Sequence, residues 1–421
     1  MANFERIELV DELHARPFMK MTAGSQIGFV VLKETREEAD ESLRAICSNF
    51  GILKPDTSKN FFRADIDDLT FKWERHSEFS SFMLYKPRAD TQDFDAKIFE
   101  LLPPDWLKKQ SDQILTSGII EIPREEKAGL KIEAVIEGWE NCFQRESLAI
   151  ALVLGGDALI ACDSQLDQNQ HIRYLIIPFE GIGGHRIGRI AQRLIEIETY
   201  KTASLLGLSV AKNANLALAE FETRMSELTI ELTNDNQELQ QLLNELTNLS
   251  ADAEQLLSAS TFRFSASGAY SDIVHNRVDI LREERFAGRQ LFSEFLLRRY
   301  TPSMRTIAST WERLREFSQR VERAANLLRT RVDVANAKSQ QDLLASMNER
   351  AETQLKLQET VEGFSVVAIT YYAISLLGYV IAPIAKWLHI EKTILIALAV
   401  VPMLIIVYKF VHGIKSKLVR H

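Results

Sequence analysis

The stretch FSVVAITYYAISLLGYVIAPIA, residues 364–385, carries no charged side chain at any of its 22 positions. A helix rises about 1.5 Å per residue, so this stretch is long enough to cross the roughly 30 Å hydrocarbon core of a bilayer. It also contains two serines, one threonine and three tyrosines. The stretch therefore predicts a membrane-spanning helix that is not apolar on all sides.

A second apolar run follows closely. Residues 393–408 are uncharged and lie between Lys392 and Lys409, whose long side chains can reach the headgroups and extend the span. Only seven residues separate the two runs, so the two spans form a hairpin. The predicted transmembrane hairpin covers 364–411, with spans at 364–385 and 393–411.

The charge of the 421-residue chain is unevenly placed. The formal total is −8, but from Lys386 onward six Lys/Arg face one acid, Glu391, so this end is +5 and the rest is −13. An acidic total argues against a nucleic-acid binder, whereas a basic end beside apolar runs suits anionic lipid headgroups. Six basic residues flank the outer ends of the two spans and two lie in the loop, which places both chain termini in the cytoplasm.

The body before the hairpin divides by pattern into two parts. Residues 1–185 read as a cytoplasmic α/β domain, because short alternating or apolar runs are interspersed with turn residues. Thr35 is a suitable N-cap for the first helix. The expected elements are a strand at 27–32, a helix at 35–50, a hairpin at 69–86, an interrupted helix at 94–110 and further strands within 148–179.

Residues 186–363 read as a helical bundle and a coiled-coil-like stalk. Helices are expected near 186–212, 213–260 and 268–300. Thr301 and Pro302 suit the N-cap and first position of a long helix that continues to Ala385. The fold class is thus an α+β membrane protein that ends in the hairpin and a basic cytoplasmic tail, 412–421.

Apolar residues of the stalk follow a heptad-like 4-3 spacing, which is typical of coiled-coil packing. The partner is either the chain's own upstream helices or other subunits, and the two arrangements can coexist. The first phase consists of Ile307, Trp311, Leu314, Ser318, Val321, Ala325, Leu328, Val332 and Ala335. The second phase consists of Leu344, Met347, Ala351, Gln354, Gln358 and Val361.

The second phase continues into the first span. There it gathers small and polar residues on one face, which either lines an aqueous path within a ring of subunits or packs helix against helix. The uncharged runs 364–385 and 393–408 contain no Asp, Glu, Lys, Arg or His, so a proton relay is not expected. This polar face consists of Ser365, Ala368, Tyr372, Ser375 and Tyr379.

Several motifs spread along the chain carry a resemblance to a known family. The chain resembles a bacterial domain-of-unknown-function family of uncharacterised membrane-anchored proteins, and the resemblance implies membrane anchoring but no activity. The motifs are ELHARPF (12–18), GRIAQRLIEIETYKTASLLGL (188–208), FRFSASGAY (262–270), LLRTRVDV (327–334) and QLKLQETVEGFSVVAITYY (354–372).

The predicted architecture also resembles CorA-type divalent-cation transporters, which are typically pentamers with the first span lining the pore. Those proteins carry a Gly-Met-Asn signature at the end of that span. Here Gly378 is followed by Tyr379 and Val380, and the short loop is basic. The resemblance therefore concerns the fold more than transport.

Two motifs are candidate anion or ligand contacts. GIGGHRIGR (181–189) follows a predicted strand and opens a helix, so Gly183, His185 and Arg186 either hold an anion or form a flexible domain joint. LHARPF places His14 near Arg16, which either contact a ligand or dock an N-terminal arm.

Other residue clusters favour structural roles. In IEIETYK, Glu196 and Glu198 point to different sides of a helix, so an interhelical hydrogen-bond network is favoured over paired catalytic carboxylates or a metal site. The three cysteines are far apart and are expected to be unreactive. No metal, no cofactor and no enzymatic activity is expected, since no catalytic or metal-binding spacing occurs.

These observations predict a cytoplasm-facing, multi-pass protein of the bacterial inner membrane. Its expected role is a homo-oligomeric binding or scaffold module in contact with the lipid bilayer and, in the cytoplasm, with a protein partner. The alternative is a divalent-cation or small-solute channel lined by the polar face of the first span.

Overall fold

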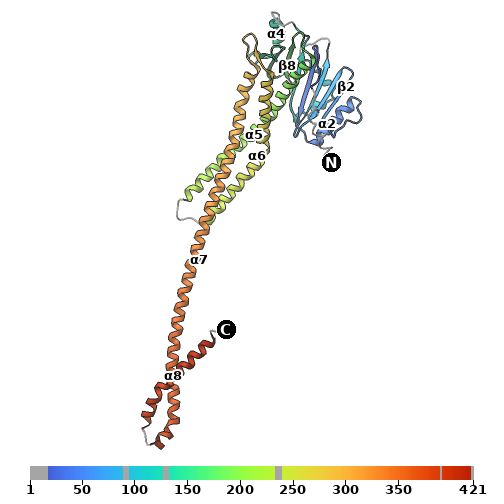
Figure 1. Ribbon diagram of the computed structural model, residues 1–421. Coiled ribbons are helices and arrows are strands. Elements are labelled where there is room, and N and C mark those ends of the chain that lie inside the picture. The colour runs from blue at the N-terminus through green and yellow to red at the C-terminus, as the bar shows by residue number, and fades with distance from the viewer. Residues whose placement is uncertain (1–17, 89–93, 127–131, 233–238, 389–390, 419–421) are drawn as a thin grey trace. The chain divides into compact units, whose positions relative to one another are not determined.

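The computed structural model describes residues 18–88, 94–126, 132–232, 239–388 and 391–418 (Figure 1). The chain divides into an N-terminal unit that ends at Ala325 and a C-terminal unit that starts at Asn326. The strands are β1 (Ser25–Leu32), β2 (Phe61–Ile66), β3 (Leu69–Arg75), β4 (Ser80–Pro87), β5 (Ile114–Ile122), β6 (Ala149–Val153), β7 (Ala158–Leu166), β8 (Ile172–Pro178) and β9 (Glu284–Arg285). The helices are α2 (Arg36–Asn49), η1 (Ala96–Leu101), α3 (Trp106–Lys109), η2 (Ser111–Gln113), α4 (Ile132–Glu140), α5 (Gly184–Glu231), α6 (Leu239–Leu281), α7 (Phe292–Leu388) and α8 (Lys392–Leu418).

The strands form one nine-stranded sheet in the order β2-β3-β4-β1-β5-β8-β7-β6-β9. Strands from the first part of the chain lie on one side, and β6, β7 and β8 lie on the other. The two groups meet at β5 and β8, which pair in parallel from Gly118–Ile172 to Glu121–Leu175, whereas the other described pairs are antiparallel. We call this junction the seam.

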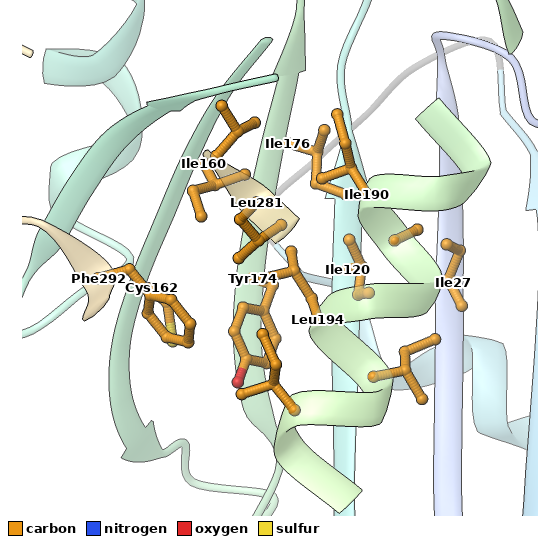
Figure 2. Close-up of a cluster of buried hydrophobic side chains, with 14 of the residues drawn as sticks. Ile27, Ile120, Ile160, Cys162, Tyr174, Ile176, Ile190, Leu194, Leu281 and Phe292 are labelled. Atoms are coloured by element: carbon orange, nitrogen blue, oxygen red, sulfur yellow. The ribbon is translucent and has the colours of Figure 1, made fainter. Parts of the chain in front are cut away.

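Helices cover both faces of the sheet. On one face, α5, the end of α6 and the start of α7 pack on the strands, and Ile190 and Leu194 of α5 lie beside Ile120 of β5 and Ile176 of β8 (Figure 2). On the other face, α2, η1, α3 and α4 cover a second apolar cluster that includes the fully buried Trp73. Because each helix covers residues from more than one strand, apolar burial holds the two strand groups together across the seam.

Local signals in the N-terminal part are confirmed. The Thr35 hydroxyl caps α2 by accepting from the Glu38 amide at 3.4 Å, and the Glu38 carboxylate accepts from the Thr35 amide at 2.7 Å. The strand at 27–32, the hairpin at 69–86 and the strands within 148–179 are also present. The interrupted helix predicted at 94–110 is present only as the short helices η1 and α3. Three elements, β2, β5 and α4, were not predicted from the sequence.

The predicted helix boundaries were wrong in three places. The structure has no break near residue 212 or between residues 260 and 268, because α5 runs to Glu231 and α6 to Leu281. The long helix α7 begins at Phe292, so Pro302 lies inside it rather than at its first position. The physical reason is packing: Phe292, Phe295 and Leu296 are buried in the core under the sheet, and this burial extends the helix upstream of the proline signal.

The first heptad phase packs within the N-terminal unit from Ile307 to Ala325, whereas Ala335 at its end is exposed. Ile307 of α7 contacts Ala211 and Ala214 of α5 and Phe264 of α6, and Leu314 and Val321 are fully buried. Polar bonds join the same helices, since Ser318 of α7 donates to the Glu254 carboxylate of α6 at 3.2 Å. The N-terminal unit therefore contains a three-helix bundle. In contrast, every residue from 333 to 361 is exposed.

The C-terminal unit contains two helices that are long and apolar enough to cross a membrane, by length and composition. The end of α7 packs on α8, where a Cβ added at Gly378 would lie 3.4 Å from Ile396 Cδ1. Val366 and Thr370 of α7 and Val407 of α8 are buried. Nevertheless only 11% and 6% of the two apolar windows are buried within the chain.

Gly207 lies where α5, α6 and α7 pack tightly and provides a test of the bundle's packing. A Cβ at this position of α5 would lie 2.4 Å from Ser267 Oγ of α6 and 3.2 Å from Ile307 Cδ1 of α7. We expect Gly207→Ala to lower the free energy of unfolding by about 1–3 kcal/mol because the three helices must separate. Thermal unfolding of the full-length protein in mild detergent, followed by circular dichroism, measures this change.

Gly268 provides the matched control, since it lies on α6 with nothing within 4 Å of an added Cβ. Gly268→Ala should be neutral or stabilise by about 0.5–1 kcal/mol, as alanine is the better helix former. Equal stability of Gly207→Ala and Gly268→Ala would contradict the packing described here.

Candidate functional site

A cavity of about 560 Å³ opens where the seam begins, and we call it the seam cavity. It forms because β5 starts at Ile114, whereas its pairing with β8 starts only at Gly118. The polar lining comes from Lys108, Ser111, Thr116, Ser117, Asn169, Gln170, His171, Glu198, Lys201 and Thr202. The apolar lining comes from Leu107, Ile114, Leu115, Leu166 and Ile172.

Glu198 of α5 is the central charged group of the cavity wall, and only 1% of its surface is exposed. Its carboxylate accepts from the Tyr174 hydroxyl of β8 at 2.7 Å and from the Thr116 hydroxyl of β5 at 3.3 Å. It also accepts from the Lys201 ammonium at 2.7 Å and the Thr202 hydroxyl at 3.3 Å. One carboxylate thus bonds to both strands of the seam, and its charge is offset by a cation one helical turn away.

The position of Glu198 follows from helix periodicity. It lies four residues after Leu194 and eight after Ile190, so it falls on the same face of α5 as these core residues. Burial there requires hydrogen-bond partners for the carboxylate, which the sheet supplies. Burial raises the pKa of Tyr174 well above its ordinary value, and the adjacent Glu198 charge acts in the same direction. The tyrosine is therefore a protonated donor.

A second polar pair lies on the opposite face of the seam. Ser117 Oγ and His171 Nδ1 are 2.8 Å apart, and the His171 ring packs on Phe99 at 4.3 Å between centroids. Burial lowers the pKa of His171 below 6.5, against the smaller opposing effect of Asp167. The Asp167 carboxylate accepts from the backbone amide of His171 at 2.8 Å. The aspartate thus orders the loop by a backbone contact.

The predicted hydrogen-bond network of IEIETYK is present in part. Glu196 bonds to Arg277 of α6, which is the expected interhelical contact. Glu198 instead bonds to the sheet and to its own helix. Among the described residues, no group of three or more His, Cys, Asp or Glu side chains could hold a metal ion. Burial raises the pKa of Cys47 to about 11, and it also raises the pKa of Cys162.

The GIGGHRIGR motif lies at the start of α5, with Gly183 as its N-cap. His185 and Arg186 are exposed, and an Arg186 Nη1 atom lies 2.5 Å from Asp157 Oδ2. Two neighbouring glycines have a packing role. A Cβ at Gly184 or Gly188 would lie 2.5 Å from the Met21 carbonyl or 1.8 Å from the Met19 carbonyl.

The proposed anion contact at Gly183, His185 and Arg186 stays a prediction. His14 and Arg16, the other predicted contact, lie outside the described residues.

The polar face of the first span lies away from α8. Tyr372 and Tyr379 are 67% and 79% exposed, and Ala368 and Ser375 are also exposed. Ser365 is half-buried, and its hydroxyl donates to the Val361 carbonyl at 2.9 Å. Within one chain the contact with α8 is made by a different face. The polar face is therefore available to another partner.

Sequence reasoning singled out Glu198 but missed Thr116, Ser117, His171 and Lys201. The first two lie on β5, a strand that the sequence analysis did not recognise. The hydroxyl pair in LTSGII, between apolar residues, was the available signal, because alternate residues of a strand face opposite sides of a sheet.

A mixed α+β fold, with a sheet domain, a helical bundle and two apolar C-terminal helices, defines the class of this protein. The chain belongs to the family described as "Protein of unknown function (DUF3422)", whose model matches residues 2–418. The predicted family resemblance is thereby confirmed. No curated protein matches the chain. No solved structure matches it either, so none supports the likeness to CorA-type transporters.

The Glu198 network provides a second test. Glu198→Gln keeps the shape of the side chain but removes the buried negative charge that faces the Lys201 ammonium. The new amide NH2 group is a hydrogen-bond donor, and it would face the hydroxyl and ammonium donors that now bond to the carboxylate. We expect a loss of about 3 kcal/mol in the free energy of unfolding. Denaturant unfolding of the full-length protein in mild detergent measures it.

Glu196→Gln is the matched control on the same helix. The side chains of Glu196 and Arg277 are 21% and 35% exposed, so the loss should be about 1 kcal/mol or less. If the two variants were equally stable, the seam would not depend on Glu198.

Proposed function

We propose that this protein is a membrane-anchored, cytoplasm-facing binding module, held in the bilayer by the hairpin of α7 and α8. The observation that carries the proposal is the exposure of the apolar helices. Leu376 of α7 and Leu398 of α8 are 68% and 76% exposed. Each exposed Leu, Ile or Val costs about 1.5–3 kcal/mol relative to burial, and a bilayer removes this cost for all of them together.

The distribution of basic residues supports one orientation. The loop side of the hairpin has two lysines, whereas the outer ends of the spans and the tail have more Lys and Arg. The positive-inside rule favours a cytoplasmic sheet domain and cytoplasmic termini, and the location that we propose is the inner membrane of a bacterium. The seam cavity lies in this cytoplasmic part and is the proposed binding site of the module.

We infer that the exposed second half of α7 assembles with other copies of the chain. Leu344, Met347 and Val361 are 65%, 58% and 57% exposed and follow the second heptad phase. Their spacing suits a coiled coil, and the chain's own bundle covers only the first phase. The same phase continues into the polar face of the first span, so a single interface includes both segments. The proposed state is a homo-oligomer, and a cytoplasmic protein partner is compatible with it.

A channel is the second candidate, and one observation favours it. The hydroxyls of Tyr372, Ser375 and Tyr379 lie on a face that α8 leaves uncovered. In a ring of several copies this face would surround the symmetry axis, and small solutes or divalent cations would pass along it. In a smaller assembly the same face packs helix on helix.

Membrane anchoring is tested by alkaline carbonate extraction of cells that produce the full chain. The protein should remain with the membranes. The double variant Leu376→Arg with Leu398→Arg should shift most of it to the soluble or aggregated fraction, because each arginine in a span costs about 3 kcal/mol. A green fluorescent protein at the C-terminus should fluoresce, whereas alkaline phosphatase there should be inactive.

Leu355→Arg is the control, since Leu355 is 61% exposed on α7 but lies before the span. It should leave the membrane fraction unchanged. Full extraction of the unmodified protein by carbonate would overturn the anchoring proposal.

Assembly is tested by disulfide cross-linking in a variant with Cys142→Ser, in which the remaining Cys47 and Cys162 are buried. Gln354→Cys lies on the second phase and should form linked dimers under mild oxidation. Lys356→Cys, which is exposed and lies on the face of the helix opposite Gln354, should remain monomeric on a denaturing gel. Equal linking of both would contradict the interface.

Native mass spectrometry then separates the two candidates. The channel would be established by two results together: a ring of about five copies, and solute flux into liposomes that Ser375→Leu abolishes. A dimer cannot enclose an aqueous path with one such face per chain. That result would exclude the channel, and the binding module would be the remaining candidate.

A further inference from the structure

The seam cavity combines an aliphatic wall with a cationic one. We propose that it binds a small aliphatic carboxylate, with the carboxylate at Lys201 and the hydrocarbon chain along Ile114, Leu166 and Ile172. This inference rests on the proposed function, in which the sheet domain is a binding module, and names the class of its ligand.

The charge of the wall favours an anion. Glu198 already accepts hydrogen bonds from four donors, which is about the full capacity of a carboxylate. Lys201 Nζ gives one of its three donors to Glu198 at 2.7 Å and has two more. Its side chain is 15% exposed, so the ammonium lies at the cavity surface rather than behind it. The second cation of the lining, Lys108, has 86% of its side chain exposed and forms an ion pair with Asp105 at 3.3 Å.

The neutral polar groups do not reverse this preference. His171 is held in its uncharged form by burial, and its Nδ1 atom is engaged with Ser117. The lining thus contains two ammonium groups and one carboxylate, and the Asp105 carboxylate outside the lining offsets the charge of Lys108, so the preference for an anion depends on Lys201. An added ammonium ligand would face the like charge of Lys201, and the one carboxylate of the lining, Glu198, already accepts from four donors.

The apolar lining favours a saturated chain. The five apolar residues around the cavity are leucines and isoleucines, and no Phe, Tyr, Trp or Arg occurs among the described lining residues, where the one aromatic ring, that of His171, already packs on Phe99. A nucleobase would normally find an aromatic or guanidinium plane to stack on, and a phosphate would find a bidentate donor. Leu166 at the end of β7 is 59% exposed, and a bound chain would cover it.

The size of the cavity is compatible with such a ligand. Ligand sites commonly measure roughly 300–1,000 Å³, and the seam cavity measures about 560 Å³. A chain of six to eight carbons fits with its carboxylate at one wall. Each buried methylene should tighten binding about fourfold.

The test uses full-length protein in amphipol and isothermal titration calorimetry with hexanoate and octanoate. Both acids should bind saturably, and octanoate about sixteenfold more tightly than hexanoate, since it buries two more methylenes. Hexylamine and inorganic phosphate should show no saturable binding. Absence of saturable binding by both acids, or equal binding of hexylamine, would overturn the inference.

Variants locate the site. Lys201→Gln should weaken octanoate binding at least tenfold. Leu166→Ser should reduce the difference in affinity between octanoate and hexanoate. Leu166 is exposed, so its variant keeps the fold even if Lys201→Gln loosens the seam. Lys212→Gln, an exposed lysine further along α5, should bind like the unmodified protein. Unchanged affinity in both Lys201→Gln and Leu166→Ser would place the ligand elsewhere and refute the assignment.

The outcome is independent of membrane anchoring. Carbonate extraction reports on the hairpin alone, so a protein that stays in the membrane but binds no acid would refute the ligand class and leave the anchoring proposal standing.

Discussion

A single buried carboxylate bonds to both strands of the parallel junction between the two strand groups of the sheet. The seam between β5 and β8 is paired over only four residues, from Gly118 to Glu121 on the β5 side. Glu198 of α5 accepts hydrogen bonds from Thr116 on β5 and Tyr174 on β8, and therefore ties the helix to both strand groups. The apolar side chains of the same helix face complete the attachment (Figure 2). Because α5 continues into the bundle, the position of the bundle on the sheet also depends on this attachment.

The heptad pattern of α7 shows how one periodic sequence can serve two purposes. Where α5 and α6 lie alongside, as at Ile307 and Leu314, the apolar stripe is buried within the chain. From residue 333 to residue 361, the helix is exposed on all sides. Period alone does not distinguish these cases, because an intramolecular bundle and an intermolecular coiled coil require the same spacing. The proposed assembly through the second phase follows from this difference in burial.

Elements with strong local signals could be predicted from the sequence. The Thr35 cap, the alternation in β3 and β4, and the apolar runs of β7 and β8 need no information from distant residues. β5 could not be recognised in this way, since Gly118 interrupts it. The structure shows why glycine is there: a Cβ would lie 2.5 Å from the Phe29 ring and 2.7 Å from the Ile172 carbonyl. That constraint comes from β1 and β8, which the local sequence of β5 does not reveal. Without β5, the seam cavity could not be predicted from the sequence either.

The edge strand β9 has a kinetic consequence. β6 ends at Val153, but the residues that pair with its outer edge, Glu284 and Arg285, follow about 130 positions later. At a synthesis rate of about 5–20 residues per second, that edge remains unpaired for about 7–26 s on the ribosome. An open strand edge is a site of aggregation during this interval. The apolar helices are made later still, so the sheet can close before they are synthesised.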